Sequence, residues 1–250
     1  MDLGITIPCL NSVKFLKTTL QEIIILKDLG CSINAVDSGS IDGTLELLYE
    51  YKINTLYYPP GNMYKAVNFG LSALDTEWYT YINSDDILHA QNTIDFFTLN
   101  AEEIENSDLF CGSVNYINEL GDTICTRKLF NKSFVRLAVL NQQPILAQPG
   151  TFFRKSLFDR LGGFDTNFRF SGDFDFFIRA FKSESRLFID PKFDLASFRS
   201  HANQFSVKES KKMLDETNRI YKKNKLKSRP LVASFLRLVL FLMNIKSWKF

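Results

Sequence analysis

The chain has 250 residues, of which 45% are hydrophobic and 23% are charged. This length fits one large domain or one domain with an appendage, and the composition excludes a disordered chain or a collagen. The net charge of +2 conceals an asymmetry: residues 1–200 carry 18 basic and 25 acidic side chains, and residues 201–250 carry 12 and 3. A basic segment after an acidic body predicts an anionic partner for that segment.

The first hundred residues alternate between strand and helix patterns. Strands are predicted at 3–8, 32–36, 54–58 and 78–82, and helices at 12–29, 44–51 and 63–74. Strands joined by helices at this spacing form a parallel sheet with right-handed crossovers. Ligands of such sheets bind beyond the carboxyl ends of the strands. The polar residues that follow these strands are therefore the first candidates for a site.

The second half of the chain is less regular. Strands at 109–117 and 122–130 indicate a hairpin, and helices are predicted at 132–140, 155–161 and 174–184, followed by a basic helix at 206–225 and a final apolar helix after Pro230. The apolar stretch 231–245 is too short, and too interrupted by Arg237 and Asn244, for a transmembrane helix. The amino-terminal residues lack the pattern of a signal peptide, and four separated cysteines indicate a reducing, cytoplasmic setting.

Two adjacent acids follow the strand at 78–82, in the turn Asn83-Ser84-Asp85-Asp86. Adjacent carboxylates repel one another unless water or a cation compensates their charge. Hard oxygen ligands at a strand end suit Mg²⁺ or Mn²⁺ bridging a diphosphate. A solvated turn that caps the next helix has the same composition, and the residues alone leave both interpretations open.

The loop 37–44 is rich in glycine, serine and aspartate. Its glycines permit close backbone approach to a ligand, and its acids can accept hydrogen bonds from sugar hydroxyls or base N–H groups. The alternative is a tight turn in which Asp42 or Ser40 caps the next helix. The loop has neither the phosphate-binding pattern GxxxxGK[ST] nor the dinucleotide pattern GxGxxG.

The segment 172–179 places acids on an apolar helix pattern. Asp175 and Arg179 have the spacing of a structural ion pair, and Asp173 is either a helix cap or a general base. Single histidines are more often structural than ligands, and His89 is interpreted in this way, whereas His201 remains a candidate.

Six segments occur in an order that resembles the family 2 glycosyltransferases of the GT-A fold. They are ITIPCLN (5–11), VDSGSIDGT (36–44), KAVNFGLSAL (65–74), YINSDD (81–86), QPGTFFRKSLFDRLGGFD (148–165) and GDFDFFIR (172–179), and HANQFS (201–206) is similar to a histidine segment of bacterial members. The resemblance implies an α/β fold with a Rossmann-like, mostly parallel sheet flanked by helices. Residues 1–100 would form the nucleotide-binding half of the catalytic domain, 101–206 the acceptor and catalytic half, and 207–250 a helical tail.

The resemblance also implies a role for each matching residue. Those expected at the nucleotide sugar are Pro8, Asn11, Asp37, Ser38, Gly39, Lys65, Asn68, Ser84, Asp85 and Gln148. Asp86 and His201 are expected to bind Mn²⁺ or Mg²⁺, and Asp173 to act as the catalytic base. The sequence departs from the family pattern at Lys65, where an acid is common, and at Gly172, where many relatives have Glu.

The implied activity is metal-dependent, inverting transfer of a sugar, of the hexosyltransferase kind, from a nucleoside-diphosphate sugar, with UDP-sugars favoured. The acceptor would be a hydroxyl of a saccharide or lipid-linked saccharide in surface polysaccharide synthesis. The alternatives are a nucleotidyltransferase, whose early glycine-rich basic loop is missing here, and an inactive relative that binds nucleotide sugars. No nucleic-acid recognition motif accompanies the basic tail.

The tail 207–250 combines a lysine-rich helix with an apolar segment. Its lysines include Lys208, Lys211, Lys212, Lys222, Lys223, Lys225 and Lys227, and its apolar residues include Phe235, Leu236, Leu238 and Trp248. Each basic residue near anionic lipid contributes about 1 kcal/mol of binding, and an interfacial helix adds apolar burial. This pattern predicts peripheral docking on the inner face of the membrane. The alternative is that the apolar segment packs on the catalytic domain or on a second subunit.

Overall fold

The computed structural model describes residues 1–129, 131–143, 145–201, 204, 209–227 and 229–244. Lys208, Trp248 and most of the segment that follows His201 lie outside these residues.

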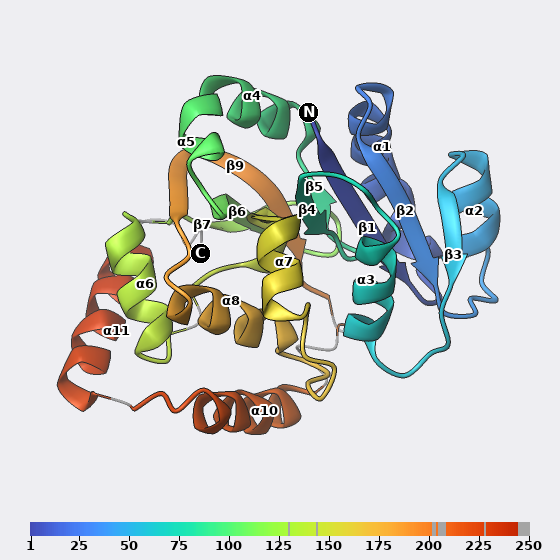
Figure 1. The fold of residues 1–250 in the computed structure, drawn as a ribbon. Helices are drawn as coiled ribbons and strands as arrows, with labels where there is room; N and C mark the ends of the chain where they lie inside the picture. Colours follow the sequence, from blue (N-terminus) through green and yellow to red (C-terminus); the bar gives the residue numbers. More distant parts are fainter. Residues whose placement is uncertain (130, 144, 202–203, 205–208, 228, 245–250) are drawn as a thin grey trace.

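Four parallel strands form one side of the sheet in the order β3-β2-β1-β4 (Figure 1). They are β1 (Leu3–Cys9), β2 (Ser32–Asp37), β3 (Asn54–Tyr57) and β4 (Trp78–Tyr81), and their crossovers contain α1 (Val13–Asp28), α2 (Thr44–Glu50) and α3 (Met63–Ser72). The arrangement predicted for the first hundred residues is confirmed. It brings the loops after β1, β2 and β4 to one edge of the sheet.

The sheet continues from β4 through mixed strands. They are β8 (Thr151–Arg154), β6 (Leu109–Ile117), β9 (Leu187–Arg199) and β5 (Ile87–Leu88), with β7 (Thr123–Arg127) paired to β6 in the predicted hairpin. β8 is antiparallel to both of its neighbours, and β6 and β9 are parallel.

β9 is the longest strand, and the sequence pattern did not predict it. It contains Pro191, which has no N–H to donate to a neighbouring strand. The pairing of β9 with β6 changes register between Cys111 and Val114. At Gly112 an added Cβ would lie 2.6 Å from the carbonyl oxygen of Phe193, so only glycine fits this irregularity. A strand interrupted in this way lacks the regular alternation by which strands are predicted.

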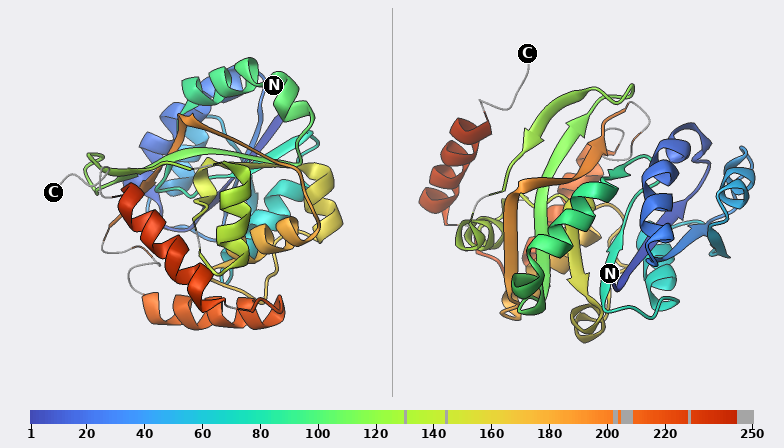
Figure 2. Two further views of the ribbon diagram at one scale, coloured as in Figure 1. Left: turned by 90° about the vertical axis from the view of Figure 1, so that its left-hand side faces the viewer. Right: turned by 90° about the horizontal axis from the view of Figure 1, so that it is seen from above.

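Helices cover both faces of the sheet, and each face has its own core (Figure 2). α1, α2, α4 (Ala90–Leu99) and α5 (Ala101–Glu105) enclose one core, and α3, α6 (Lys132–Leu140), α7 (Lys155–Leu161) and α8 (Gly172–Lys182) enclose the other. A short 3₁₀ turn, Gln148–Gly150, precedes β8. Phenylalanines fill both cores, and this packing explains much of the count of 24.

The two tail helices pack on the second of these cores. α10 (Ser210–Lys223) runs along α8, and α11 (Pro230–Asn244) lies beside α6 (Figures 1 and 2). Ile220 of α10 and Leu236 of α11 are fully buried. Within the described part of the chain, no helix is both long and apolar enough to cross a membrane.

Asp175 fastens α8 to α10. Its buried carboxylate accepts hydrogen bonds from Arg179 Nε at 2.7 Å, Lys223 Nζ at 2.9 Å and Asn224 Nδ2 at 2.8 Å. The ion pair predicted between Asp175 and Arg179 is confirmed. A buried charge is tolerated when it is paired and hydrogen-bonded, and the partners here come from both helices.

Candidate active site

The loops that follow β1 and β2 are joined by hydrogen bonds of Asn11. Its backbone N–H donates to Ser40 Oγ at 2.8 Å, and its Oδ1 accepts the N–H of Ile41 at 3.0 Å. Asn11 has a φ of 50°, in the left-handed region that asparagine tolerates better than most residues. Two of the loops expected to bind nucleotide therefore form one continuous polar surface.

Asp37 is buried, and its carboxylate bonds within its own loop. It accepts the N–H groups of Gly39 at 2.8 Å and Ser40 at 2.9 Å, together with the Ser40 hydroxyl. Gly39 is exposed, and Ser38 and Pro8 are half-buried. Asp37 thus fixes the shape of the loop, and its neighbours provide the surface that a ligand could reach.

The end of β4 brings Ser84 and Asp85 to the same edge. Ser84 Oγ donates to Ser12 Oγ at 2.7 Å. Asp85 Oδ2 lies 2.9 Å from His201 Nε2, and the side chain of Asp85 is 23% exposed. The His201 ring packs on Phe15, with ring centroids 4.8 Å apart. A carboxylate and an imidazole that are distant in the sequence therefore meet at an accessible position.

Asp86, unlike its neighbour, is fully buried. Its Oδ1 accepts the backbone N–H of Arg199 at 2.9 Å, and its Oδ2 accepts Asn83 Nδ2 at 3.0 Å. Burial, reinforced by the charge of Asp85, holds the pKa of the Asp86 carboxyl well above its usual range. This geometry differs from that expected of a cation ligand: both oxygens bond to the protein, and neither the side chain nor the backbone of Asp86 is exposed.

Arg199 was not among the candidates from the sequence. Its Nε donates to the carbonyl oxygen of Asp85 at 2.9 Å, and its Nη1 donates to that of Glu119 at 3.1 Å. Its guanidinium lies over the Phe15 ring, 5.0 Å from the centroid. Arg199 thus ties the acidic turn to the β6–β7 hairpin. In the sequence, only its position two residues before the candidate His201 could have indicated this role.

Asp173 lies in the first turn of α8 and is oriented by a tyrosine. Its Oδ1 accepts the Tyr64 hydroxyl at 3.0 Å and the N–H of Phe174 at 2.8 Å. Tyr64 and Tyr81, at the end of β4, pack on the same ring, that of Phe164, with centroid distances of 5.6 and 5.4 Å. Asp173 is thereby linked to the edge of the sheet that carries Asp85.

Burial raises the pKa of the Asp173 carboxyl, and the hydrogen bonds from Phe174 and Tyr64 oppose this shift. Desolvation disfavours the charged form, whereas donated hydrogen bonds favour it. The result is a carboxylate that is more basic than an exposed one, as a general base requires. Tyr64 was missed in the sequence because an aromatic residue in an amphipathic helix suggests core packing.

Gln148 and Asn83 present acceptor oxygens that lack partners. Gln148 is buried and donates through Nε2 to the carbonyl oxygen of Tyr81, which orients its Oε1. Among the described residues, neither Gln148 Oε1 nor Asn83 Oδ1 has a hydrogen-bond partner, although both atoms are buried. Buried acceptors are normally satisfied, so these two atoms suit the hydroxyl groups of a bound ligand.

Two of the residues expected at the nucleotide sugar, Lys65 and Asn68, lie on α3. Lys65 is exposed. The side chain of Asn68 bonds twice to Phe164: Nδ2 donates to its carbonyl oxygen at 2.8 Å, and Oδ1 accepts its N–H at 3.0 Å. Asn68 therefore anchors the loop after α7. Its expected contact with the nucleotide stays a prediction.

His89 joins β5 and β9, as a structural residue would. Its Nε2 lies 2.8 Å from Ser197 Oγ, and its Nδ1 contacts the carbonyl oxygen of Asp194. The interpretation of His89 from the sequence is confirmed.

A family model described as Glycosyl transferase family 2 matches residues 5–162. The chain therefore belongs to the family 2 glycosyltransferases. The glycosyltransferase described as "PGL/p-HBAD biosynthesis glycosyltransferase" from Mycobacterium bovis is 26% identical over 190 residues, which are 72% of this chain and 70% of that protein. An uncharacterized glycosyltransferase of Rickettsia prowazekii is 23% identical over 192 residues, 74% of this chain, and the chain spans only 60% of its length.

The fold is that of the GT-A glycosyltransferases. TarS from S. aureus, solved in complex with UDP, superposes with a TM-score of 0.66 at 16% identity, over 92% of this chain and 67% of that chain. The mannosyltransferase PcManGT from Pyrobaculum calidifontis was solved with GDP-Man and Mn²⁺. It superposes with a TM-score of 0.65 at 16% identity, over 97% of this chain and 70% of that chain. The expected fold class is confirmed by these likenesses.

Proposed function

We propose that the protein is an inverting glycosyltransferase that moves a sugar from a nucleoside-diphosphate sugar to an acceptor hydroxyl. The observation that carries this proposal is the position of Tyr81. Its ring packs on Phe164 together with that of Tyr64, which orients Asp173, and the turn with Asp85 begins two residues after it. A candidate base and a candidate cation site thus lie at the carboxyl end of one strand, which is where ligands bind in sheets of this kind.

Asp173 is the proposed base. Its Oδ2 accepts the proton of the acceptor hydroxyl while that oxygen forms a bond to the anomeric carbon. The bond from this carbon to the diphosphate oxygen breaks in the same step, and the electron pair leaves with the diphosphate. A single displacement inverts the anomeric centre. Tyr64 holds Oδ1 and so keeps Oδ2 turned toward the acceptor.

Asp85 and His201 are the proposed protein ligands of Mn²⁺ or Mg²⁺. Within the described residues no cluster of three ligating side chains exists, so a diphosphate and water would complete the coordination. One carboxylate and one imidazole, 2.9 Å apart and partly exposed, fit that arrangement. The cation, when bound, would neutralise the charge of the leaving diphosphate. We therefore move the cation from Asp86, where the sequence placed it, to Asp85.

The donor is proposed to contact the joined loops after β1 and β2, at Pro8, Asn11, Ser38 and Gly39, with Asp37 as the residue that shapes them. Ser84 and Gln148 complete the proposed donor surface, and Lys65 is proposed to reach the diphosphate from α3. UDP-sugars are the favoured donors, because TarS and glucosyl-3-phosphoglycerate synthase from Mycobacterium tuberculosis were solved with UDP-GlcNAc and UDP-Glc. The proposed acceptor is a saccharide or a lipid-linked saccharide used in surface polysaccharide synthesis.

Turnover of a donor panel tests this function. The purified chain is incubated with UDP-GlcNAc, UDP-Glc or GDP-Man, with Mn²⁺ or with EDTA, and released nucleoside diphosphate is measured. We expect release from one donor only, and only with Mn²⁺. The absence of release from every donor, together with Mn²⁺-dependent binding of UDP, would identify an inactive relative. Release of the sugar 1-phosphate in place of the nucleoside diphosphate would identify a nucleotidyltransferase.

We further propose that α11 docks on an anionic membrane surface. Leu231, Phe235 and Leu238 are 88%, 62% and 55% exposed and lie on one side of the helix, whereas Leu236 faces the core. Exposed basic residues accompany them, including Lys211, Lys212, Lys222, Lys225, Lys227, Arg229 and Arg237. An apolar helix face flanked by basic residues is typical of interfacial helices.

Replacing Leu231, Phe235 and Leu238 together by Ser is expected to abolish flotation of the chain with anionic vesicles at low salt. Deletion of α11 is a poorer test because it would also remove the buried Leu236. The matched control is Leu99→Ser. Leu99 is 73% exposed and lies in α4, on the other face of the sheet, so this variant should float like the parent. Equal flotation of the triple variant, or none by the parent chain, would reject membrane docking.

A further inference from the structure

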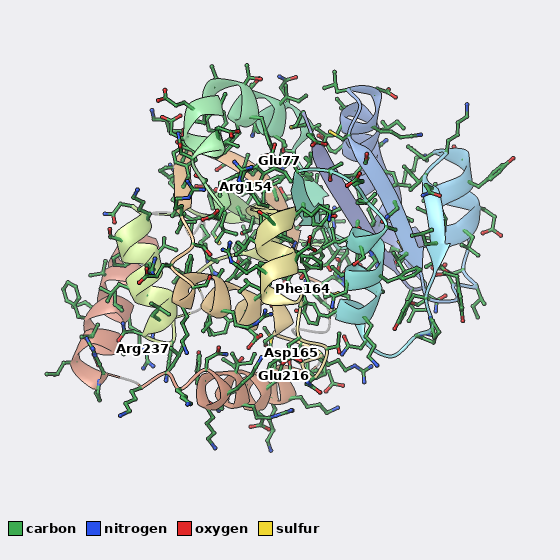
Figure 3. The ribbon with its side chains drawn as sticks, viewed as in Figure 1. Glu77, Arg154, Phe164, Asp165, Glu216 and Arg237 are labelled. Atoms are coloured by element: carbon green, nitrogen blue, oxygen red, sulfur yellow. The ribbon has the colours of Figure 1, made fainter. Side chains whose placement is uncertain are left out.

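The segment before α8 is held by a carboxylate from the tail. Glu216 of α10 is buried, with 5% of its surface exposed. Its Oε1 accepts the backbone N–H groups of Phe170 and Ser171, both at 2.7 Å, and its Oε2 accepts that of Arg169 at 2.8 Å. Figure 3 labels Glu216 on α10, which lies below α8 in this view. Three consecutive amides are thus bound by one side chain.

These three amides lie immediately before the residues of the site. Ser171 is the N-cap of α8, but its side chain makes no capping hydrogen bond. The helix start therefore depends on Glu216, whose negative charge also suits the positive end of the helix dipole. Asp173 follows Ser171 by two residues, so the direction of the backbone at 169–171 sets the position of its carboxylate.

A second support acts on the other side of the same segment. Asn62, the N-cap of α3, donates through Nδ2 to the carbonyl oxygens of Thr166 at 2.9 Å and Phe168 at 3.0 Å. Gly172 packs against Tyr64, since an added Cβ would lie 2.8 Å from its ring. This contact accounts for the glycine at a position where the family pattern often has Glu. The start of α8 is therefore enclosed between α3 and α10.

α10 itself is firmly attached. Lys223 pairs with Asp165 at 2.7 Å and with Asp175 at 2.9 Å, and Ile220 is fully buried. Lys182 of α8 donates to the carbonyl oxygen of Asn224 at 2.8 Å. A carboxylate on a helix anchored in this way can hold a loop at a fixed position, whereas a carboxylate on a loose tail could not.

We propose that Glu216 is a positioning residue for Asp173, and that α10 is an integral part of the active site. This inference rests on the proposed role of Asp173 as the base. It changes the expected domain organisation, in which residues from 207 onward form a separate tail. Glu216 would then be needed for full turnover, and the membrane-facing role would be confined to α11 and to exposed basic residues.

The pH dependence of turnover can report on the charge of Glu216. The titratable groups that face Asp173 are Tyr64 of α3, Tyr81 of β4 and Glu216 of α10. Burial is the main cause of the raised pKa of Asp173, and the charge of Glu216 adds to it. Removing that charge favours the ionised form of Asp173. Because the base must be ionised to act, the acid limb of the rate profile should move to lower pH.

Three variants separate positioning from simple stability. Glu216→Gln keeps an acceptor for Phe170 and Ser171 but loses the charge and turns an amide N–H₂ toward Arg169. Glu216→Ala loses all three bonds. Ile220→Ala is the control: it removes a buried side chain from the same helix, which destabilises the fold through a cavity without touching 169–171.

For Glu216→Ala we expect kcat to fall by about 10- to 100-fold per folded molecule, the scale of a misplaced catalytic group. Binding of UDP with Mn²⁺, measured by calorimetry, should stay within about twofold of the parent, because the hydrogen bonds of Glu216 go to the amides of residues 169–171 and not to the donor loops. Glu216→Gln should fall less in kcat and show the shifted acid limb. Ile220→Ala should show a lower Tm with the parent's kcat per folded molecule and the parent's pH profile.

Unchanged kcat and pH profile in both Glu216 variants would overturn the inference, as would an equal loss of kcat in Ile220→Ala. If Glu216→Ala does not fold, Glu216→Gln and Glu216→Asp take its place, and the shorter Asp should recover the acid limb of the parent. Asp173→Asn distinguishes the two levels of failure. Full activity of Asp173→Asn would show that Asp173 is not the base. An inactive Asp173→Asn together with fully active Glu216 variants would reject only the positioning role of Glu216.

Discussion

Asp173→Asn is expected to lower kcat by at least about 10²-fold, the usual scale for a lost general base, and to leave Mn²⁺-dependent binding of UDP unchanged. The amide oxygen of Asn can still accept the hydrogen bonds of Tyr64 and Phe174, so the local geometry is preserved. The atom that changes is Oδ2, which receives the proton in the proposed reaction. Turnover of the active donor and calorimetry with UDP measure the two effects separately.

The same substitution is expected to raise the Tm at neutral pH. Burial raises the pKa of Asp173 in the folded state, so the ionised carboxylate destabilises the fold at any pH above the unfolded pKa. That cost is relieved as the pH falls through the folded pKa toward the unfolded one, and the difference in Tm between variant and parent should shrink there. A variant that unfolds at a lower temperature, with a folded fraction as active as the parent, would show that Asp173 is only a helix cap.

The parallel half of the sheet was predictable because its signals are local. Strands such as Leu3–Cys9 and Ser32–Asp37 are short apolar runs that end in polar turns, and amphipathic helices separate them. Once strands are parallel, their carboxyl ends must share one edge, so the clustering of Asn11, Ser38 and Asp85 follows from topology. β9 escaped prediction because Pro191 and the register change interrupt its alternation.

The finer geometry of the site depends on contacts between distant residues. The string that contains Asp85 and Asp86 does not say which carboxylate is buried, because that is decided by the backbone of Arg199, which is 113 residues away from Asp86 in the sequence. Likewise, nothing local marks Glu216 as the partner of Ser171, 45 residues before it. Such pairs become visible only after the helices pack. Sequence reasoning could therefore place the candidate residues at one edge of the sheet, but it could not find the residues that support their side chains.

Asp85→Asn is expected to remove the Mn²⁺-dependent part of UDP binding and nearly all turnover. Asp85 is the acid of the pair whose side chain is partly exposed, and it faces His201 at 2.9 Å. An amide is a weaker ligand than a carboxylate because it lacks the negative charge that a divalent cation favours. Titration of UDP into the protein with Mn²⁺ and with EDTA measures the Mn²⁺-dependent increment, which is the gain in affinity for UDP that Mn²⁺ provides. His201→Ala should reduce this increment without affecting UDP binding in EDTA.

Asp86→Asn is the matched comparison, since it makes the same chemical change one residue further on. It is expected to retain the Mn²⁺-dependent increment, because the Asp86 oxygens bond to Arg199 and Asn83 inside the protein. Its effect should fall on stability, through the contact that ties the acidic turn to the end of β9. The opposite pattern, with the increment lost in a folded Asp86→Asn and kept in Asp85→Asn, would return the cation to Asp86. Comparing two neighbouring acids in one assay therefore decides which of them the metal uses, whatever donor sugar the enzyme prefers.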